Sequence, residues 1–129
     1  MTSRGPVGAG RQPLTPPYAR AVVRQLRIYE IFDDTRDAFL DRFRDHAARI
    51  MARHGFRILA AWESSLDGRL EFVYLLEWPD EETMRAQWAA FLADEEWQAI
   101  KRETAARHGT LVGDIEDRVL RPVAGFPHV

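Results

Sequence analysis

Apolar and polar side chains alternate early in the chain and then change to helical spacing. Residues 22–32 alternate, as at Leu26 and Arg27, and are rich in β-branched and aromatic types, which predicts a strand. Over residues 36–54 apolar side chains return every three or four positions, which predicts an amphipathic helix. The members of this apolar stripe are Phe39, Leu40, Phe43, Ala47, Ile50 and Met51.

The rest of the pattern predicts a hairpin, two helices and a last strand. In chain order the elements are strands over 56–64 and 70–78, helices over about 80–92 and 94–106, and a strand over 114–121. Asp67-Gly68 is a hairpin turn signal between the strands over 56–64 and 70–78. Asp94 is the expected N-cap of the helix over 94–106. The order β-α-β-β-α-(α)-β predicts a ferredoxin-like α+β fold, in which one antiparallel sheet carries its helices on one face.

Both faces of this predicted sheet carry apolar side chains. Along residues 70–78, Phe72 and Tyr74 point one way, whereas Val73 and Leu75 point the other way. The helices cover only one face, and a second copy of the chain is the simplest cover for the other. We therefore expect a homodimer.

The first 20 residues differ from the rest in composition. They hold four of the seven prolines, three of the eight glycines and no Asp or Glu, too little apolar surface to offset the entropy of folding. We expect a disordered tail over 1–20, one domain over 21–122 and a short C-terminal tail over 123–129. The leader lacks the apolar segment of a secretory signal, and no apolar run is long enough to cross a bilayer. We expect a cytoplasmic protein without a membrane partner.

Charge and residue usage exclude several classes of function. The net charge of −2 combines three arginines in the first 20 residues with a net −5 over the remainder, so the body does not attract nucleic acid. The absence of cysteine excludes disulfides, thiolate nucleophiles and zinc–thiolate sites. Phosphate-binding glycine loops, the hydrolase elbow and the metalloprotease helix motif are all missing. No acid–histidine cluster has metal-ligand spacing, so we expect neither metal nor cofactor.

Five segments of the chain resemble the NIPSNAP family. They are QLRIY (25–29), HGFRILAAWES (54–64), YLLEW (74–78), WAAFLADEEWQAI (88–100) and GTLVGDIEDRVLRPV (109–123). The resemblance covers about residues 23–122 and implies a dimeric α+β barrel, in which the sheets of two ferredoxin-like units form the barrel and the helices lie outside. One departure concerns the first strand, which commonly reads Glu-Leu-Arg in the family and carries Gln25 here.

The resemblance implies less about function than about fold. NIPSNAP-like domains mostly lack an assigned reaction, and the wider barrel superfamily includes cofactor-free oxygenases of aromatic polyketides, haem-binding and haem-degrading proteins, isomerases, dehydratases and simple ligand binders. Fold alone does not choose among these activities. In this fold the cavity usually lies between sheet and helices, so the candidate residues are those that face it.

Two histidines lie near the apolar stripe of the first predicted helix. His46 comes three residues after Phe43, and His54 comes four residues after Ile50. Their separation corresponds to about 12 Å along a helix, too far for one metal ion. One interpretation is ordinary packing at the edge of the core, with His54 at a helix C-terminus. The other is a general base or a haem ligand.

The strands and the second helical region supply further candidates. Arg27 and Tyr29 share one face of the first strand and are candidates for stabilising an anion during catalysis. Amphipathic aromatic side chains often line cavities, although ordinary sheet packing or a dimer contact explains them equally well. The candidate ligand-binding residues are Tyr74, Trp62, Trp78, Trp88 and Phe43.

Three hypotheses follow for the function. The first is an accessory protein that binds a small apolar or aromatic metabolite without turnover. The second is a cofactor-independent oxygenase, cyclase or isomerase of bacterial secondary metabolism, with His46 or His54 as base and Arg27 or Tyr29 beside the resulting anion. The third is haem binding through one of the histidines, which a Soret band would reveal.

Overall fold

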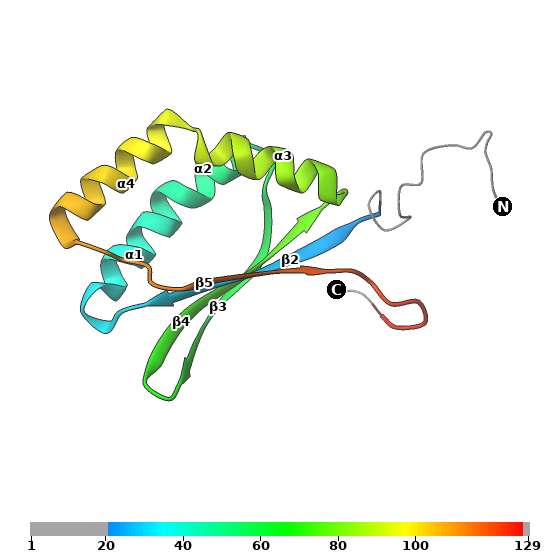
Figure 1. The fold of residues 1–129 in the computed structure, drawn as a ribbon, viewed down its shortest axis with the longest axis horizontal. Coiled ribbons are helices and arrows are strands. Elements are labelled where there is room, and N and C mark those ends of the chain that lie inside the picture. Colours follow the sequence, from blue (N-terminus) through cyan, green and yellow to red (C-terminus); the bar gives the residue numbers. More distant parts are fainter. Residues whose placement is uncertain (1–20, 128–129) are drawn as a thin grey trace.

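The computed structural model describes residues 21–127 (Figure 1). The predicted tail over 1–20 lies outside the described residues. Each predicted element is present within a few residues of its expected bounds. The strands are β2 (Val23–Ile31), β3 (Arg57–Leu66), β4 (Arg69–Trp78) and β5 (Ile115–Leu120). The helical segments are η2 (Asp33–Thr35), α1 (Arg36–Arg42), η3 (Phe43–Ala47), α2 (Ala48–Arg53), α3 (Glu81–Leu92) and α4 (Glu95–His108).

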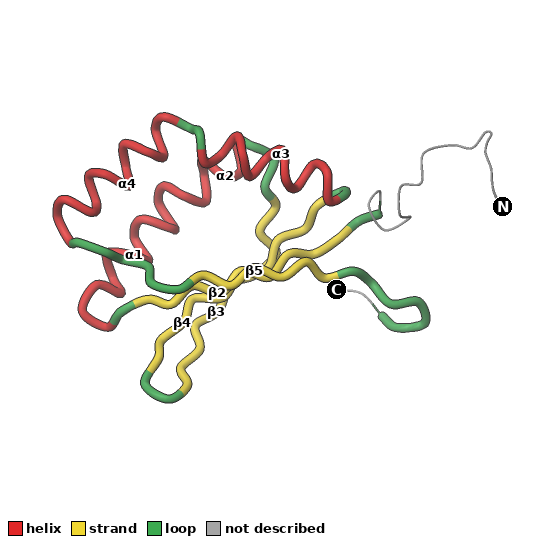
Figure 2. The backbone as a smooth tube through the Cα atoms, in the orientation of Figure 1, coloured by secondary structure: helices red, strands yellow, loops and turns green. Residues whose placement is uncertain are grey.

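The four strands form one antiparallel sheet in the order β3-β4-β2-β5. The first strand in the chain, β2, therefore pairs with the last two strands, β4 and β5. Figure 2 shows all the helices on the same side of this sheet. The ferredoxin-like α+β prediction is confirmed.

One helical segment runs from α1 to α2 and contains a π turn at its centre. This turn is η3. It interrupts the regular helix predicted over 36–54, whose two ends are present as α1 and α2. A π turn advances less per residue than an α turn, so residues four apart stay nearly aligned while residues three apart turn further away. Phe43 and Ala47 are both buried, whereas His46 between them is only partly buried.

The core lies between the helices and the face of the sheet that they cover. Trp78, Tyr74 and Phe39 are its largest fully buried side chains. Aromatic rings from the helical segment meet rings from β4, with centroids 5.0 Å apart for Phe39 and Phe72 and 4.7 Å apart for Phe43 and Phe72. This packing holds α1 and η3 against the middle of the sheet.

The opposite face of the sheet carries apolar side chains that no described helix covers. We call it the open face, and its apolar members include Leu26, Ile28, Ala60, Trp62, Leu66, Val73, Leu75 and Leu120. Ile28 pairs with Val73, and Trp62 lies on the other side of Val73. Trp62 is 51% exposed. The two-faced apolar pattern predicted from the sequence is therefore present.

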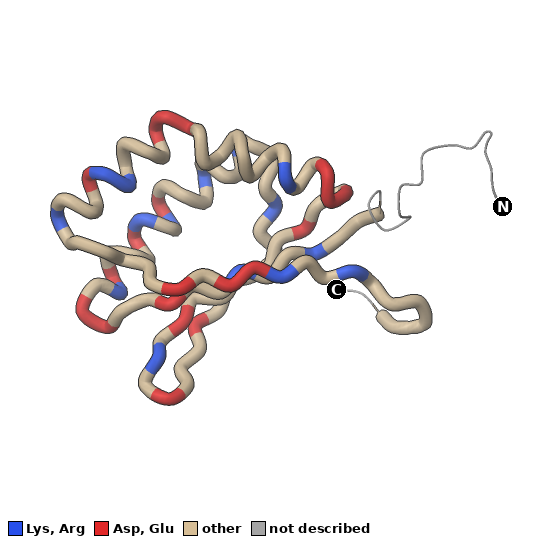
Figure 3. Tube along the Cα trace, in the orientation of Figure 1, with Lys and Arg blue, Asp and Glu red and all other residues tan. Residues whose placement is uncertain are grey.

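Charged residues of both signs are interspersed along the helices and strands (Figure 3). Most of them form ion pairs at the surface, such as Arg36 with Glu63 and Arg49 with Glu96. None of the described helices is long and apolar enough to cross a membrane.

Candidate functional site

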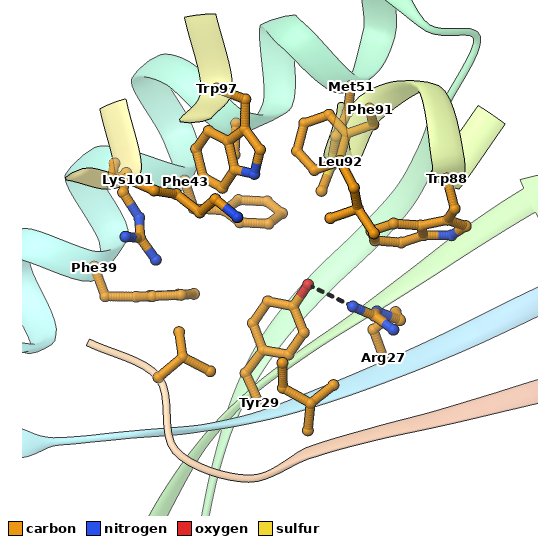
Figure 4. Close-up of a pocket in the computed structure, with 14 residues that line it drawn as sticks. Arg27, Tyr29, Phe39, Phe43, Met51, Trp88, Phe91, Leu92, Trp97 and Lys101 are labelled. Carbon is orange, nitrogen blue, oxygen red and sulfur yellow. Dashed lines mark hydrogen bonds between the residues drawn. The ribbon is translucent and has the colours of Figure 1, made fainter. Parts of the chain in front are cut away.

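A cavity of about 180 Å³ lies between the covered face of the sheet and the helices. Arg27 and Tyr29 rise from β2 toward aromatic side chains of α3 and α4 (Figure 4). The lining is mostly apolar, and these side chains are Phe39, Phe43, Ala47, Met51, Trp88, Phe91, Leu92, Trp97, Val112 and Ile115. Arg42 and Lys101 complete it. The cavity is thus an aromatic chamber with cationic groups at its edge.

Arg27 is held at the cavity by three neighbours. Its guanidinium lies 4.2 Å from the ring centroid of Trp88, and Nη2 donates a hydrogen bond of 3.1 Å to the hydroxyl of Tyr29. Nη1 forms an ion pair of 3.1 Å with Asp117, which stands directly opposite on β5. Burial works against the charge of Arg27, but the oxygens of Tyr29 and Tyr74 outweigh it and raise its pKa. Arg27 therefore stays protonated, and Asp117 balances its charge.

The Tyr29 hydroxyl reaches the cavity and is held from behind by a second tyrosine, Tyr74. The hydroxyl oxygens of Tyr29 and Tyr74 are 2.6 Å apart, and Tyr74 is fully buried behind Tyr29. Burial, followed by the neighbouring Tyr29, raises the pKa of Tyr74 well above its usual value, although Arg27 works in the opposite direction. Tyr74 is therefore neutral at physiological pH and holds the Tyr29 hydroxyl in place.

Arg42 and Lys101 approach the cavity from two helical segments and share one aromatic neighbour. The guanidinium of Arg42, on α1, is 5.3 Å from the ring centroid of Trp97, and the ammonium of Lys101, on α4, is 5.9 Å from it. Neither residue was among the candidates from the sequence. Local periodicity marks Arg42 as a polar helix position, and the only signal at Lys101 is that it is the single lysine of the chain.

Gln25 supports the cavity from below through three side-chain hydrogen bonds. Its carbonyl oxygen accepts from the indole nitrogens of Trp78 and Trp88, each at 2.8 Å. Its amide donates to Asp117 at 2.9 Å. Gln25 is the position where the family commonly has glutamate, and a glutamate here would set a second carboxylate against Asp117. The amide thus fixes both the indole that stacks on Arg27 and the acid that pairs with Arg27.

The two candidate histidines lie outside the cavity. His54 Nε2 is 2.8 Å from Asp94 Oδ2, in the contact between α2 and the start of α4. His46 Nδ1 is 3.2 Å from Arg49 and faces a separate polar hollow between α1, η3 and α4. Neither histidine lines the cavity that contains Arg27 and Tyr29. The structure therefore does not bring the proposed base and the proposed anion-stabilising groups together.

The aromatic candidates divide among three places. Phe43 and Trp88 line the cavity, and Tyr74 reaches it only through the Tyr29 hydroxyl. Trp78 is fully buried in the core against Gln25, and Trp62 lies on the open face. The cavity residues absent from the candidate list are mainly those whose position depends on how the helices pack.

Among the acids in the described residues, Asp94 has the pKa that is lowered most. It caps α4, since Oδ1 accepts from the backbone N–H of Trp97 at 3.0 Å, as predicted from the sequence. The bond with His54 contributes most to lowering the pKa of Asp94, followed by Trp97 N–H and Arg53. A carboxyl with a lowered pKa stabilises the fold above its unfolded pKa of about 3.9 and loses that effect as the pH falls.

We therefore expect a pH-dependent stability difference between the wild type and Asp94→Asn. Asparagine keeps an N-cap acceptor but not the charge, so the variant is less stable at neutral pH. The difference should shrink as the pH drops below about 4. Urea unfolding at a series of pH values measures it, with the exposed Asp34→Asn as control. A difference that does not change with pH would contradict this account of Asp94.

No group of three or more His, Asp or Glu side chains within residues 21–127 is arranged to hold a metal ion. The groups that the cavity offers a ligand are guanidinium, ammonium, tyrosine hydroxyl and aromatic ring. These groups bind and orient organic molecules, and they stabilise negative charge.

Comparison with known families decides the membership of the chain. The sequence model of the NIPSNAP domain matches residues 24–127. The chain belongs to the NIPSNAP family. A solved NIPSNAP-like domain protein from Burkholderia xenovorans, described as uncharacterised, superposes with a TM-score of 0.69 at 20% identity. The alignment covers 85% of this chain and 92% of that chain.

Two oxygenases of Streptomyces share the fold of this NIPSNAP domain. SnoaB from Streptomyces nogalater, a cofactor-independent oxygenase, superposes with a TM-score of 0.53 at 16% identity, covering 83% of this chain and 98% of that one. A monooxygenase from the gene ActVA-Orf6 of Streptomyces coelicolor, solved with nanaomycin D, gives a TM-score of 0.53 at 15% identity, with coverages of 85% and 95%. At these identities the likeness establishes the fold alone. No curated protein matches the chain.

Proposed function

We propose that this NIPSNAP domain binds a small aromatic or apolar molecule in the cavity between its sheet and its helices. The observation that carries the proposal is the cavity itself, about 180 Å³ of space lined mainly by aromatic and aliphatic side chains. Trp88 and Trp97 offer ring faces, and Tyr29 offers a hydroxyl held by Arg27. Apolar walls with a few convergent polar groups are typical of small-molecule sites.

Isothermal titration of the purified protein with 2-naphthamide, a neutral bicyclic probe, tests this proposal. We expect saturable binding with one site per chain. Burial of the probe should also give a negative heat-capacity change of binding. The absence of saturable binding for both neutral and charged naphthalene probes would overturn it.

The second candidate is cofactor-independent catalysis on an acidic aromatic substrate. It is favoured by the chain of contacts from Arg27 to Tyr29 to Tyr74, which could stabilise a phenolate or enolate. Two proteins of the same fold are described as a cofactor-independent oxygenase and a monooxygenase. Chromatography after incubation with a dihydroxynaphthalene in air, without metal or flavin, distinguishes turnover from binding. The third hypothesis, haem binding, has less support, because neither His46 nor His54 lines this cavity.

We also propose that two copies of the chain pair through their open faces. Leu26, Ile28, Val73 and Leu75 form a continuous apolar strip across β2 and β4, and Trp62 extends it onto β3. A large apolar area on a sheet face is costly to leave in water. A second copy of the same face covers it with two-fold symmetry.

Analytical ultracentrifugation at micromolar concentration tests the dimer. The wild type should sediment with twice the mass of the 14.9 kDa chain. Ile28→Arg, which places a charge at the centre of the open face, should sediment as a monomer because it would bury an unpaired cation. Ala52→Arg, at an exposed position of α2 on the helix side of the sheet, is the matched control and should remain a dimer. A monomeric wild type would refute the pairing.

A further inference from the structure

Three cationic side chains reach a cavity whose walls are otherwise apolar. Arg27 is neutralised by Asp117, and its contacts with Tyr29 and Trp88 leave it integrated into the sheet. Arg42 and Lys101 differ from it. None of the carboxylates in the described part of the chain lies within ion-pairing distance of either. The cavity therefore has more positive charge than its own residues neutralise.

Arg42 is partly buried, yet the acids nearest to it pair with another arginine. The acids nearest to it in sequence are Asp41 and Asp45, and both are paired with Arg44 instead. Burial lowers the pKa of Arg42, whereas the neighbouring Tyr29 raises it. A partly buried guanidinium without an acid pays a desolvation penalty that an anionic partner would offset. Its contact with Trp97 supplies only part of that compensation.

Lys101 lies near the same indole ring but comes from α4, whereas Arg42 comes from α1. Its ammonium approaches Trp97 from α4, one turn beyond the tryptophan itself, and Figure 4 shows it among the aromatic side chains above Tyr29. Glu103, Arg107 and His108 follow on the same helix but face the separate hollow beside His46. Two cations and one ring face are thus presented to the same space.

We propose that the cavity selects aromatic carboxylates, with the ring between Trp88 and Trp97 and the carboxylate held by Arg42 and Lys101. This inference rests on the proposed function and names its ligand class. Guanidinium matches the planar geometry of a carboxylate, and the ammonium adds a second donor. Arg27 and the Tyr29 hydroxyl meet the opposite edge of the ligand. A neutral aromatic fills the same space but leaves the two cations without a partner.

A pair of isosteric probes tests the charge selectivity. Isothermal titration with 2-naphthoate and with 2-naphthamide compares an anion and a neutral molecule of nearly equal shape. In the wild type we expect 2-naphthoate to bind at least about tenfold more tightly. In Arg42→Met and Lys101→Met this preference should fall strongly, while the affinity for 2-naphthamide stays within about twofold. Methionine keeps the apolar stem that packs on Trp97.

Matched surface variants show whether the effect is local. Arg85→Met removes an exposed arginine of α3, and Arg102→Met removes the exposed neighbour of Lys101. Both should retain the full preference for 2-naphthoate. Raising the salt concentration should weaken binding of the anion and leave binding of the amide unchanged.

The possible outcomes separate this inference from the proposed function. Equal affinity for the two probes in the wild type would overturn the carboxylate selectivity and leave the cavity as a neutral aromatic site. Loss of preference in Arg85→Met or Arg102→Met as well would assign the preference to general surface charge and also overturn the inference. Failure of both probes to bind would overturn the proposed function.

Discussion

Gln25→Leu should lower the free energy of unfolding by about 3–5 kcal/mol, the largest stability effect that we expect from one polar side chain of this protein. The carbonyl oxygen of Gln25 accepts hydrogen bonds from the indoles of Trp78 and Trp88. Leucine leaves both N–H groups without an acceptor, and each unsatisfied buried donor costs about 1–3 kcal/mol. The contact with Asp117 is lost as well.

Equilibrium unfolding in guanidinium chloride, followed by tryptophan fluorescence, measures the loss. Gln98→Leu on α4 is the matched control, because the Gln98 side chain is exposed and donates only one hydrogen bond, to the carbonyl of Leu92. Its effect should stay within about 0.5 kcal/mol. If Gln25→Leu lowered the free energy of unfolding no more than the control does, the hydrogen bonds of Gln25 would not stabilise the base of the cavity.

The second large effect concerns binding. Ala47→Phe should weaken the binding of both naphthalene probes by at least about tenfold. Ala47 lies on the π turn, is 1% exposed and lines the cavity opposite Tyr29 and Arg27. A phenyl ring at this position fills space that the probes need, and it leaves Arg42 and Lys101 in place.

Ala52→Phe on α2 is the control for the larger side chain. Ala52 is exposed on the same helical segment and does not line the cavity, so its variant should bind both probes like the wild type. Overpacking in Ala47→Phe itself should cost about 1–3 kcal/mol of stability, which guanidinium unfolding detects. Unchanged binding in a folded Ala47→Phe protein would place the ligand elsewhere.

The helical segment from α1 to α2 connects the fold to the proposed function. It supplies Phe39, Arg42, Phe43, Ala47 and Met51 to the cavity wall, and its π turn lies in the middle of that set. π turns inside helices are frequent at functional sites, because they re-aim side chains at the cost of regular hydrogen bonding. Here the turn keeps Phe43 and Ala47 buried at the cavity, while His46 lines the separate hollow.

Local periodicity was sufficient to predict the order of elements and the faces of the strands. Alternation along 70–78 assigned Phe72 and Tyr74 to one face of β4 and Val73 to the other, because a strand has a period of two wherever it lies. The same rule placed Arg27 and Tyr29 together. The stripe spacing of helices identified Phe43 and Trp88 as inward residues. Both now line the cavity.

Local periodicity does not predict contacts between segments that are far apart in the chain. Arg42 and Lys101 are 59 positions apart and meet at Trp97 only because α1 and α4 pack side by side. Spacing alone grouped His46 and His54 on one stripe, whereas in the structure His46 lies in the π turn and His54 contacts Asp94 at the start of α4. The role of Gln25 likewise needs two indoles and an acid from three other elements.

The sequence by itself therefore determined the ferredoxin-like order and the two apolar faces of the sheet, which follow from short-range pattern, and five of its segments resembled the NIPSNAP family. The tertiary structure decided which charges remain unpaired beside the cavity and which polar side chains are satisfied away from it. Pairing of charges depends on distances of a few ångströms between segments far apart in the chain. Those distances exist only once the helices have packed on the sheet.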